Sequence, residues 1–359
     1  MSAPPKVALV AIPLMARSGV YRSAHDLVRT AREAGLDWTA IVGMRPAAAG
    51  TPLETPGVRE VETAARGLAG VRQIRRILDE AKEVLDADVI VSLISQSDVA
   101  LSKLSARTSR AWVAWVRGKP WPAHGEQSGW RRLLLRWLES RALRAADEVW
   151  ATTPVLAQEF ASVRSATIVP AGIAAVRRVS SGDDADSPLV WAGRIDVDKR
   201  PGLFAQIVEL TGHPGRVFGD GPLRLGLSKH PVNGLTWEGW RDAAGLWGDA
   251  SIFIGTSARE AFGRSAVEAA AAGLPLVIGS EYGAAPLLFT SPRFRDLCVI
   301  GSDDPAVWAT AVRRLLLDRD LRIAVSEHVY QNAQALTIAS SVAHARDRLQ
   351  VVVQARRSH

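Results

Sequence analysis

Short apolar runs alternate with amphipathic segments along almost the whole chain of 359 residues. Residues 7–12, 111–116, 252–254 and 275–278 are apolar runs of this kind. Strands of a parallel sheet have this composition, because helices cover both faces of the sheet and exclude water from it. The pattern therefore predicts an α/β protein built from doubly wound, Rossmann-like domains.

The alternation stops once and then restarts, which predicts two domains. Residues 174–187 are small and polar, lie between two prolines, and form the expected linker. Residues 1–173 are then the first domain and residues 188–338 the second. A final helix in residues 339–359 is expected to pack back on the first domain.

The periodicity of the apolar residues predicts individual elements. Strands are expected over 7–12, 38–42, 88–94, 111–116, 148–152, 167–169, 189–191, 215–218, 235–237, 252–254 and 275–278. Helices are expected over 22–34, 67–85, 130–145, 201–210, 222–227, 241–247, 264–272, 305–317, 321–336 and 340–353.

The net charge of +7 favours anionic partners such as nucleotide diphosphates, phospholipid surfaces or acidic polymers. Nucleic acid is not expected, because the sequence has no zinc-finger pattern, RNA-binding signature or basic tail. Cys298 is the single cysteine, so an intramolecular disulfide and a cysteine metal cluster are excluded. This composition is typical of the reducing cytoplasm.

The N-terminal apolar run, residues 7–15, is too short for a bilayer, which needs roughly 20 residues. It also lacks a small-residue cleavage site, so we expect a buried strand rather than a signal peptide. The protein is therefore predicted to be cytoplasmic, with any membrane contact peripheral and at the inner face.

Residues 258–278 contain two acids around an expected helix start. Glu260 precedes a Phe-Gly step, and Glu268 lies in the Ala-rich segment that follows. A helix that begins near Gly263 would offer its first-turn N–H groups and its dipole to a phosphate. Glu260 would be free on a loop over this helix start, and Glu268 would lie about one turn in. The alternative is a solvated helix with two surface glutamates.

Two more loops of the second domain follow predicted strands. The first contains Gly193, Arg194 and Lys199, and two such cations can neutralise a diphosphate. The second begins at Gly219, where the missing side chain permits close backbone approach. In a parallel sheet these loops converge with residues 258–278. Each alone also fits a surface ion pair or a simple turn.

In the first domain, ligands are expected outside the carboxyl ends of the strands. Ser18 and Gly19 follow the first predicted strand, and Arg117 follows the fourth. A plain turn explains Gly19 equally well, because one glycine is a weak signal. His124 lies a few residues after Arg117 and could reach the same place, although a loop histidine is more often simply exposed.

The chain resembles the retaining glycosyltransferases of family 4. This group has the GT-B fold, in which two Rossmann-like domains face each other across a cleft. The second half carries the resemblance in GRIDVDKRP, FGDGPL, LTWEGW, GDASIFIGTS and EAFGRSAVEAAAAGLPLVI. The first half agrees more loosely, in SGVYRSAHDLVRTAREAGLDW, AADEVWATTPVLAQEF and TIVPAGI.

The resemblance implies a hexosyltransferase that moves a sugar from a nucleotide diphosphate-sugar donor to a glycan, a lipid-linked acceptor or a small molecule. Arg194 and Lys199 would bind the diphosphate and Glu260 the transferred sugar, so these three are the catalytic candidates. Glu268 would hold the ribose. The full implied donor set is Gly193, Arg194, Lys199, Gly219, Trp240, Arg241, Glu260, Phe262, Gly263, Arg264, Ser265 and Glu268.

The amides of residues 263–265 would receive phosphate oxygens, and the turn at residues 239–241 would lie near the base. The implied acceptor side consists of Ser18, Gly19, Arg117 and His124. Retention in the family is commonly explained by front-face attack, in which the leaving phosphate takes the acceptor proton. No dedicated protein base, metal or further cofactor is then expected.

Two segments depart from the family pattern. Many members carry a histidine where this chain has Arg117, and the usual Gly-Gly-Pro-Glu pattern is replaced at residues 283–286 by Gly-Ala-Ala-Pro without a following acid. Two other functions stay open: a nucleotide-sugar epimerase of the same fold, and a non-catalytic sugar- or nucleotide-binding protein. The spacing of the two glutamates, with Arg194 and Lys199, favours transfer.

Six of the 12 tryptophans lie between Trp112 and Trp150, and the predicted helix over 130–145 adds five arginines. Basic helices with tryptophan can lie on anionic membranes, and tryptophan also stacks on sugars. The favoured interpretation is that the apolar stripe of this helix belongs to the core and its arginines are solvated, because each helix of a doubly wound domain is amphipathic.

Overall fold

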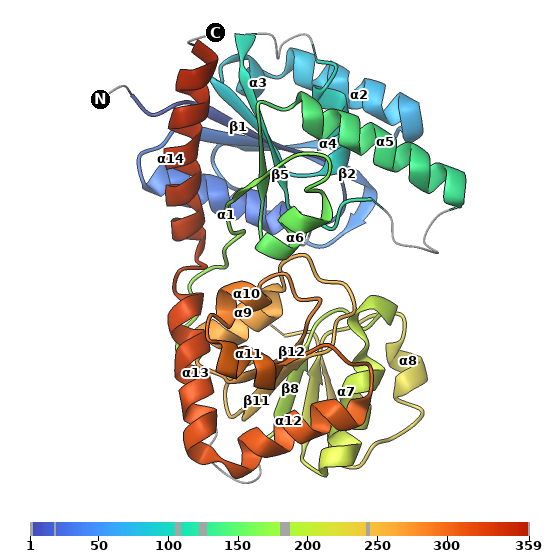
Figure 1. Cartoon of the computed structure of the whole chain (residues 1–359). Helices are drawn as coiled ribbons and strands as arrows, with labels where there is room; N and C mark the ends of the chain where they lie inside the picture. Colours follow the sequence, from blue (N-terminus) through green and yellow to red (C-terminus); the bar gives the residue numbers. More distant parts are fainter. Residues whose placement is uncertain are drawn as a thin grey trace. The chain divides into compact units, whose positions relative to one another are not determined.

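The computed structural model describes residues 3–17, 19–104, 109–121, 128–179, 187–241 and 245–357 (Figure 1). The chain forms two compact units. The first contains Met1–Gly172 and Ile338–His359, and the second contains Ile173–Thr337. The first unit is therefore made from two separate stretches of sequence.

A seven-stranded sheet of order β3-β2-β1-β4-β5-β6-β7 forms the centre of the first unit. Its strands are β1 (Val7–Ala16), β2 (Trp38–Ala49), β3 (Val58–Glu62), β4 (Val89–Ser92), β5 (Ala111–Val116), β6 (Glu148–Ala151) and β7 (Thr167–Ile168). The strand pairs described are parallel. Val7 pairs with Trp38 on one side and with Val89 on the other, so the first apolar run lies inside the sheet.

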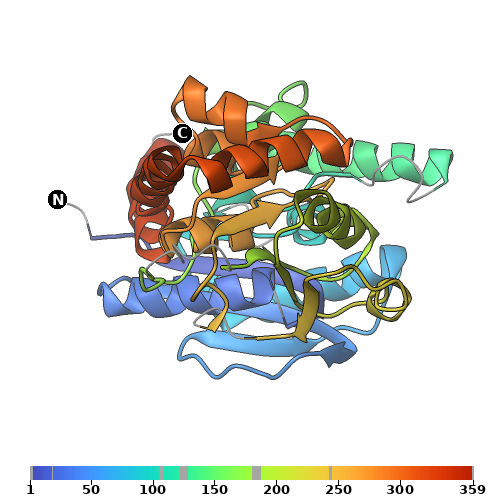
Figure 2. The same ribbon diagram turned by 90° about the horizontal axis from the view of Figure 1, so that it is seen from below.

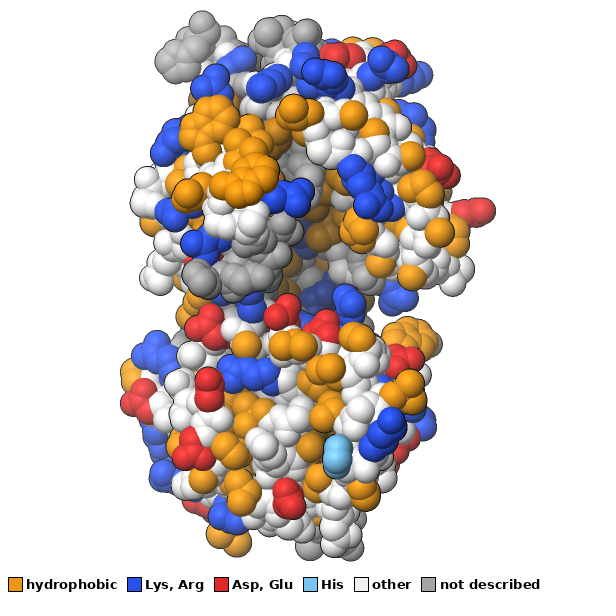
Figure 3. Space-filling model, turned by 90° about the vertical axis from the view of Figure 1, so that its right-hand side faces the viewer, with side chains coloured by type: hydrophobic (Ala, Val, Ile, Leu, Met, Phe, Trp, Pro, Cys, Tyr) orange, Lys and Arg blue, Asp and Glu red, His pale blue; other side chains and the backbone are white. Residues whose placement is uncertain are grey.

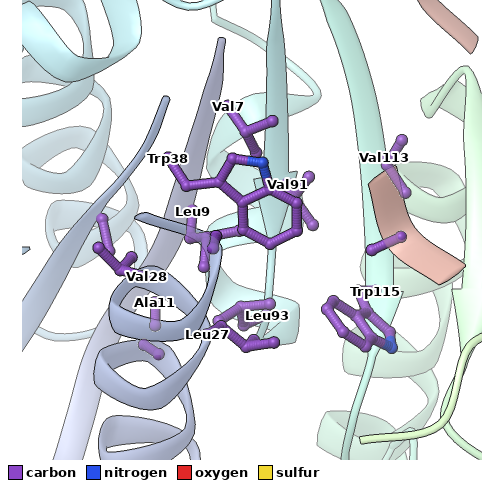
Figure 4. Close-up of a cluster of buried hydrophobic side chains, with 14 of the residues drawn as sticks. Val7, Leu9, Ala11, Leu27, Val28, Trp38, Val91, Leu93, Val113 and Trp115 are labelled. Atoms are coloured by element: carbon purple, nitrogen blue, oxygen red, sulfur yellow. The ribbon is translucent and has the colours of Figure 1, made fainter. Parts of the chain in front are cut away.

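Helices cover both faces of this sheet. They are α1 (Val20–Glu33), α2 (Gly67–Glu80), α3 (Lys82–Leu85), α4 (Ser95–Leu101), α5 (Gly129–Ala145), α6 (Pro154–Glu159) and α14 (Ile338–Arg357). Helices α1 and α14 pack together on one face, while α2, α4 and α5 lie side by side on the other (Figure 1). Figure 4 shows the core beneath α1, where Trp38 lies near Leu9 and Val91, and Leu27 near Leu93.

The second unit contains a six-stranded parallel sheet of order β10-β9-β8-β11-β12-β13. Its strands are β8 (Leu189–Ala192), β9 (Gly215–Phe218), β10 (Leu235–Gly239), β11 (Ile252–Gly255), β12 (Leu276–Gly279) and β13 (Val299–Ile300). Strands β8 and β11 are neighbours in space although β9 and β10 separate them in sequence. The loops that follow β8 and β11 therefore leave the sheet side by side.

The helical elements of the second unit are η2 (Val197–Lys199), α7 (Pro201–Thr211), α8 (Arg224–Leu227), α9 (Arg264–Ala271), α10 (Ala285–Leu288), α11 (Pro292–Cys298), α12 (Pro305–Leu317) and α13 (Arg319–Ala333). Helix α12 packs against α7, and α13 packs against α9 and α10 (Figures 1 and 2). The Ala-rich α9 is short and buries five of its side chains, which lets it lie close to β11 and β12.

The α/β class and the doubly wound sheets are confirmed, with several corrections. Strand β3 and helix α4 were not expected from the sequence, so Arg117 follows the fifth strand of the first unit rather than the fourth. The helix expected over 67–85 is interrupted at Ala81, whose backbone is extended (φ −78°, ψ 118°). Of the helix expected over 241–247, residues 242–244 lie outside the described residues, and so do 180–186 of the expected linker. In the described part of the chain, no helix is long and apolar enough to cross a membrane.

Candidate functional site

The loop after β8 is held in place by a buried hydroxyl. Thr256 follows β11, and its Oγ1 lies 2.9 Å from the carbonyl oxygens of both Lys199 and Arg200. The indole Nε1 of Trp191 donates a hydrogen bond to the same Oγ1 (2.9 Å). A second cross-loop bond joins the Ala258 amide to the Asp198 carbonyl (2.8 Å). The position of Lys199 is therefore fixed by the neighbouring strand.

The backbone of the same loop also lies very close to the backbone of the turn that follows β9. Gly219 has φ +128°, and a Cβ atom built on it would lie 1.9 Å from the carbonyl oxygen of Gly193. A Cβ atom on Gly221 would lie 2.4 Å from the carbonyl oxygen of Ile195. The Ile195 amide also donates to the carbonyl of Asp220 (2.9 Å). Glycine at 219 is required both by its backbone angle and by this approach.

Lys199 and Glu260 form an ion pair across the two loops, in which Nζ donates to the carboxylate. The expectation that Glu260 is free on its loop is therefore wrong. It is wrong because β8 and β11 are adjacent strands, which brings the two loop ends together. The lysine side chain is 25% exposed and the glutamate 20%, so both reach the surface of the unit.

Helix α9 begins as expected, directly after Gly263, which has φ +92°. The amide of Val267 donates to the Gly263 carbonyl (3.1 Å), so the amides of residues 264–266 precede the first hydrogen bond of the helix and have no acceptor within it. Glu268 lies one turn in, where its carboxylate is 3.5 Å from Nη2 of Arg264. This helix start presents amide dipoles beside the Lys199–Glu260 pair, because Gly263 lies against Glu260.

The ring of Tyr282 packs against the start of α9. A Cβ on Gly263 would lie 2.4 Å from the Tyr282 ring, and a Cβ on Gly255 would lie 2.6 Å from its hydroxyl oxygen. That hydroxyl is 3.2 Å from Oγ of Ser257. Burial, together with the charge of Glu260, raises the pKa of Tyr282, so the phenol stays neutral. The ring fills space that only glycine at 255 and 263 leaves open.

Other expected donor residues make contacts of their own. Arg194 is 72% exposed and its Nε lies 3.2 Å from the carboxylate of Asp196. Trp240 is 63% exposed. Arg241 donates to Glu238 (2.9 Å). Phe262 is buried, and its carbonyl accepts from the Ala284 amide (2.9 Å), so the segment of residues 283–286 supports the Glu260 loop.

The first unit has a pocket of about 210 Å³ where β4 and β5 end. Arg117 and Lys119 line it together with two acids, the buried Asp98 and the half-buried Glu139. Burial raises the pKa of Asp98 to about 7, and its Oδ1 has no hydrogen-bond partner among the described residues. Burial also raises the pKa of Glu139, whose carboxylate accepts from the Trp121 amide (3.0 Å). Two cations therefore line the pocket together with two acids whose pKa values are raised by burial.

Arg117 is positioned by several contacts. Its Nη2 lies 2.5 Å from Oγ of Ser23 and 3.4 Å from the carbonyl oxygen of Ala171, and its guanidinium stacks over the Trp115 ring at 4.6 Å. Lys119 pairs with Glu159. This arrangement places a cation directly after β5.

Gly19, which was expected on the acceptor side, is not among the residues that line this pocket. Gly19 precedes α1 with φ +49°, and a Cβ there would meet nothing within 4 Å, which fits a turn. Its neighbour Arg17 bonds to Glu60 on β3 and holds the pKa of that carboxyl below its usual range. Ser18 and His124 lie outside the described residues.

Four residues of these sites were not predicted from the sequence: Thr256, Tyr282, Asp98 and Glu139. Thr256 lies just after the end of a predicted strand, and this position could have marked it as a candidate site residue. Tyr282 and Asp98 act through burial, which depends on the packing of distant segments and leaves no local pattern.

The second unit matches a known family. Residues 187–318 match the family described as glycosyl transferases group 1. A stretch of 106 residues is 37% identical to D-inositol 3-phosphate glycosyltransferase of Corynebacterium kroppenstedtii, covering 30% of this chain and 23% of that protein. The chain thus spans less than a quarter of the length of the curated relatives it matches.

Solved structures resemble the chain over nearly its full length. Sucrose-phosphate synthase from Thermosynechococcus elongatus superposes with a TM-score of 0.71 at 18% identity, covering 96% of this chain and 99% of that one. The Anabaena protein Alr3699/HepE in complex with UDP and glucose gives 0.72 at 16% identity, with the same coverage. The fold is therefore that of the GT-B glycosyltransferases.

Proposed function

We propose that the protein is a retaining glycosyltransferase of family 4, which moves a sugar from a nucleotide diphosphate-sugar to a glycan, a lipid-linked acceptor or a small molecule. One observation carries the proposal: the ion pair of Lys199 and Glu260 lies beside the start of α9. A cation, a sugar-binding acid and first-turn amides are what a donor of this kind requires. The family match of the second unit supports the same class.

The donor roles follow from the chemistry of each group. Lys199 and Arg194 bind the diphosphate, and the amides at the start of α9 receive its oxygens. Glu268 holds the ribose, and Glu260 accepts hydrogen bonds from hydroxyls of the transferred sugar. The segment with Trp240 and Arg241 lies near the base.

The transfer step depends on stabilising the leaving group. As the bond from the anomeric carbon to the phosphate oxygen breaks, the departing nucleoside diphosphate gains negative charge. Fixed cations and amide dipoles aimed at that charge lower the barrier. The acceptor oxygen attacks from the same face, and its proton passes to the leaving phosphate. This scheme needs no metal and no dedicated protein base, so a chelator should leave turnover unchanged.

The first unit binds the acceptor in this proposal. Its pocket contains Arg117 and Lys119 with Asp98 and Glu139. Asp98, whose pKa is about 7, can both donate to and accept from hydroxyl groups, which suits a polyhydroxylated acceptor. The two cations would orient the acceptor and repel competing cations.

A donor screen tests the proposal. The protein is incubated with UDP-, GDP- and ADP-sugars, with and without a mixed panel of sugar and polyol acceptors, and nucleotide release is measured. UDP-glucose is the first choice, because the Anabaena structure of this fold holds UDP and glucose. NMR of the anomeric proton in the product reports retention.

Three results are distinguished by this screen. Release that requires an acceptor supports transfer, whereas conversion of the donor to an epimer without an acceptor would assign epimerase activity instead. Nucleotide binding by calorimetry without any turnover would assign a binding protein. The variant Lys199→Ala should strongly reduce the rate of nucleotide release, while Lys229→Ala, which replaces an exposed lysine after α8 in the same unit, should not.

A further inference from the structure

Helix α5 has large apolar side chains on its exposed side. Trp130, Leu133, Leu134 and Trp137 are 67%, 65%, 46% and 57% exposed. Their spacing of three and four residues places them in one stripe along the helix. The expectation that the apolar stripe of this helix is core is therefore wrong for these four positions. Figure 3 shows hydrophobic side chains gathered on one face of the first unit, with Lys and Arg side chains around them.

The exposed stripe lies opposite the face that packs on the unit. The buried residues of α5 are Ser140, Ala142 and Leu143. At 100° per residue, Ala142 and Leu143 lie on the far side of the helix axis from Trp130 and Trp137. Only about half of the apolar residues of α5 are thus used for packing. The other half forms a patch that a water-facing helix does not need.

The surroundings of the stripe are positive. Helix α5 contains five arginines and one acid, Glu139, which faces inward to accept a hydrogen bond from the Trp121 amide. The guanidinium groups of Arg131 and Arg141 each lie 6.0 Å from the ring of an exposed tryptophan, Trp130 and Trp137 respectively. The stripe is therefore an apolar strip lined by cations.

Helix α2 extends this surface. It lies on the same face of the sheet, with α4 between it and α5 (Figure 1). Leu68 on α2 is 73% exposed, and Arg72 and Arg76 are exposed beside it. Two helices on the same face of the sheet thus present arginine together with exposed leucine or tryptophan.

We propose that the α5 stripe (Trp130, Leu133, Leu134 and Trp137, with Arg131 and Arg141) docks the first unit on an anionic lipid membrane. Tryptophan rings are stable at the boundary between headgroups and acyl chains, leucines enter the apolar layer, and arginines pair with lipid phosphates. A second copy of the chain fits less well, because a two-fold contact through this stripe would bring the arginines of both copies together. Docking through α5 does not depend on the proposed sugar transfer.

Vesicle binding of the full chain tests this inference. Vesicles of equal parts phosphatidylglycerol and phosphatidylcholine are compared with pure phosphatidylcholine by co-sedimentation at low and physiological salt. We expect at least tenfold tighter binding to the anionic vesicles, and weaker binding as salt rises. Lipids brominated on the acyl chains should quench part of the tryptophan fluorescence.

Two variants locate the contact. Trp130→Ala with Trp137→Ala should weaken anionic-vesicle binding at least tenfold and remove the bromine quenching. Arg131→Gln with Arg141→Gln should reduce the salt dependence. The control, Leu225→Ala with Leu317→Ala, removes two leucines of the second unit that are 78% and 87% exposed, and should bind as the wild type does.

The inference is overturned if the wild type does not bind anionic vesicles at low salt, or if the double tryptophan variant binds them equally well. It is also overturned if sedimentation shows a dimer without lipid that the tryptophan variant abolishes, since the stripe would then be a self-association surface. Thermal unfolding of each variant confirms that the side chains removed were not needed for folding.

Discussion

Lys199 donates a hydrogen bond to Glu260, although 61 residues separate them in the chain. The contact exists because β8 and β11 are adjacent, and because Thr256 at the end of β11 holds the carbonyls of Lys199 and Arg200. Both side chains reach the surface of the unit. In the proposed function, the donor therefore meets a cation whose position is fixed by tertiary contacts.

Replacing Lys199 tests the role of the cation. Lys199→Ala should lower kcat/KM for the donor by about 30- to 1,000-fold, which corresponds to about 2–4 kcal/mol of transition-state stabilisation. Steady-state nucleotide release measures this, with Lys229→Ala as the matched control. Unchanged kinetics in Lys199→Ala would remove Lys199 from the diphosphate site.

Glu260→Gln separates sugar binding from phosphate binding. The amide keeps the shape of the side chain but removes the charge that pairs with Lys199, so nucleoside diphosphate should bind as tightly as before or more tightly. Sugar transfer should fall at least tenfold, because the carboxylate no longer accepts hydrogen bonds from the sugar. Calorimetry with UDP measures the affinity for nucleoside diphosphate, and turnover assays measure the rate of sugar transfer. Equal losses of affinity and rate would mean that Glu260 maintains the structure of the loop instead of binding the sugar.

Gly219→Ala should disrupt the turn after β9. The new methyl group would meet the carbonyl oxygen of Gly193, and alanine is strained at φ +128°. We expect the free energy of unfolding to fall by at least ~2 kcal/mol, with loss of nucleotide binding.

Gly226→Ala is the control for this change, because a Cβ there meets nothing within 4 Å and the residue lies in α8. It should stay within about 1 kcal/mol of the wild type. Urea denaturation of both variants would show the contrast, and a stable Gly219→Ala protein would contradict the proposed close approach.

Asp98 should make the first unit less stable as pH rises. Its pKa is about 7 in the folded protein, against an ordinary value of 3.8. Between these values the folded state keeps a proton that the unfolded state has released, so the free energy of unfolding falls by about 1.4 kcal/mol per pH unit. The loss begins near pH 4 and is complete above pH 7.

Asp98→Asn stays neutral and should lack this fall, so its stability relative to the wild type should increase from pH 4.5 to pH 7.5. Urea denaturation followed by circular dichroism at four pH values measures the difference. Asp86→Asn, at an exposed aspartate of the same unit, should run parallel to the wild type. Parallel curves for Asp98→Asn and the wild type would mean that Asp98 is not protonated when folded.

Much of the fold could be predicted because its central strands are short apolar runs. Strands β5 and β9 have the expected bounds, and α9 begins after the expected glycine. Strand β3 was missed because it lies at the edge of the sheet, where none of its five residues is fully buried and the apolar signal is weak. Helix α4 was missed because it is short and polar, with Asp98 and Ser97 buried by contacts from distant segments.

Part of the candidate site could also be predicted from the sequence. Lys199 and Glu260 each follow a strand, so the convergence of their loops followed from a parallel sheet. Their ion pair could not be predicted in this way, because it depends on loop conformations that Thr256 and Tyr282 fix through tertiary contacts. The exposure of Trp130 and Trp137 could not be predicted either, since periodicity shows that a helix has an apolar stripe but not which way the stripe faces.

The C-terminal helix α14 has a consequence for the order in which the protein folds. Ile338, Val342, Leu349 and Val353 belong to the same buried cluster as Val7 and Leu9. The first unit thus cannot complete its core until residues 338–353 have left the ribosome. The second unit, Ile173–Thr337, is synthesised before them. During translation the first unit is therefore expected to finish folding after the second.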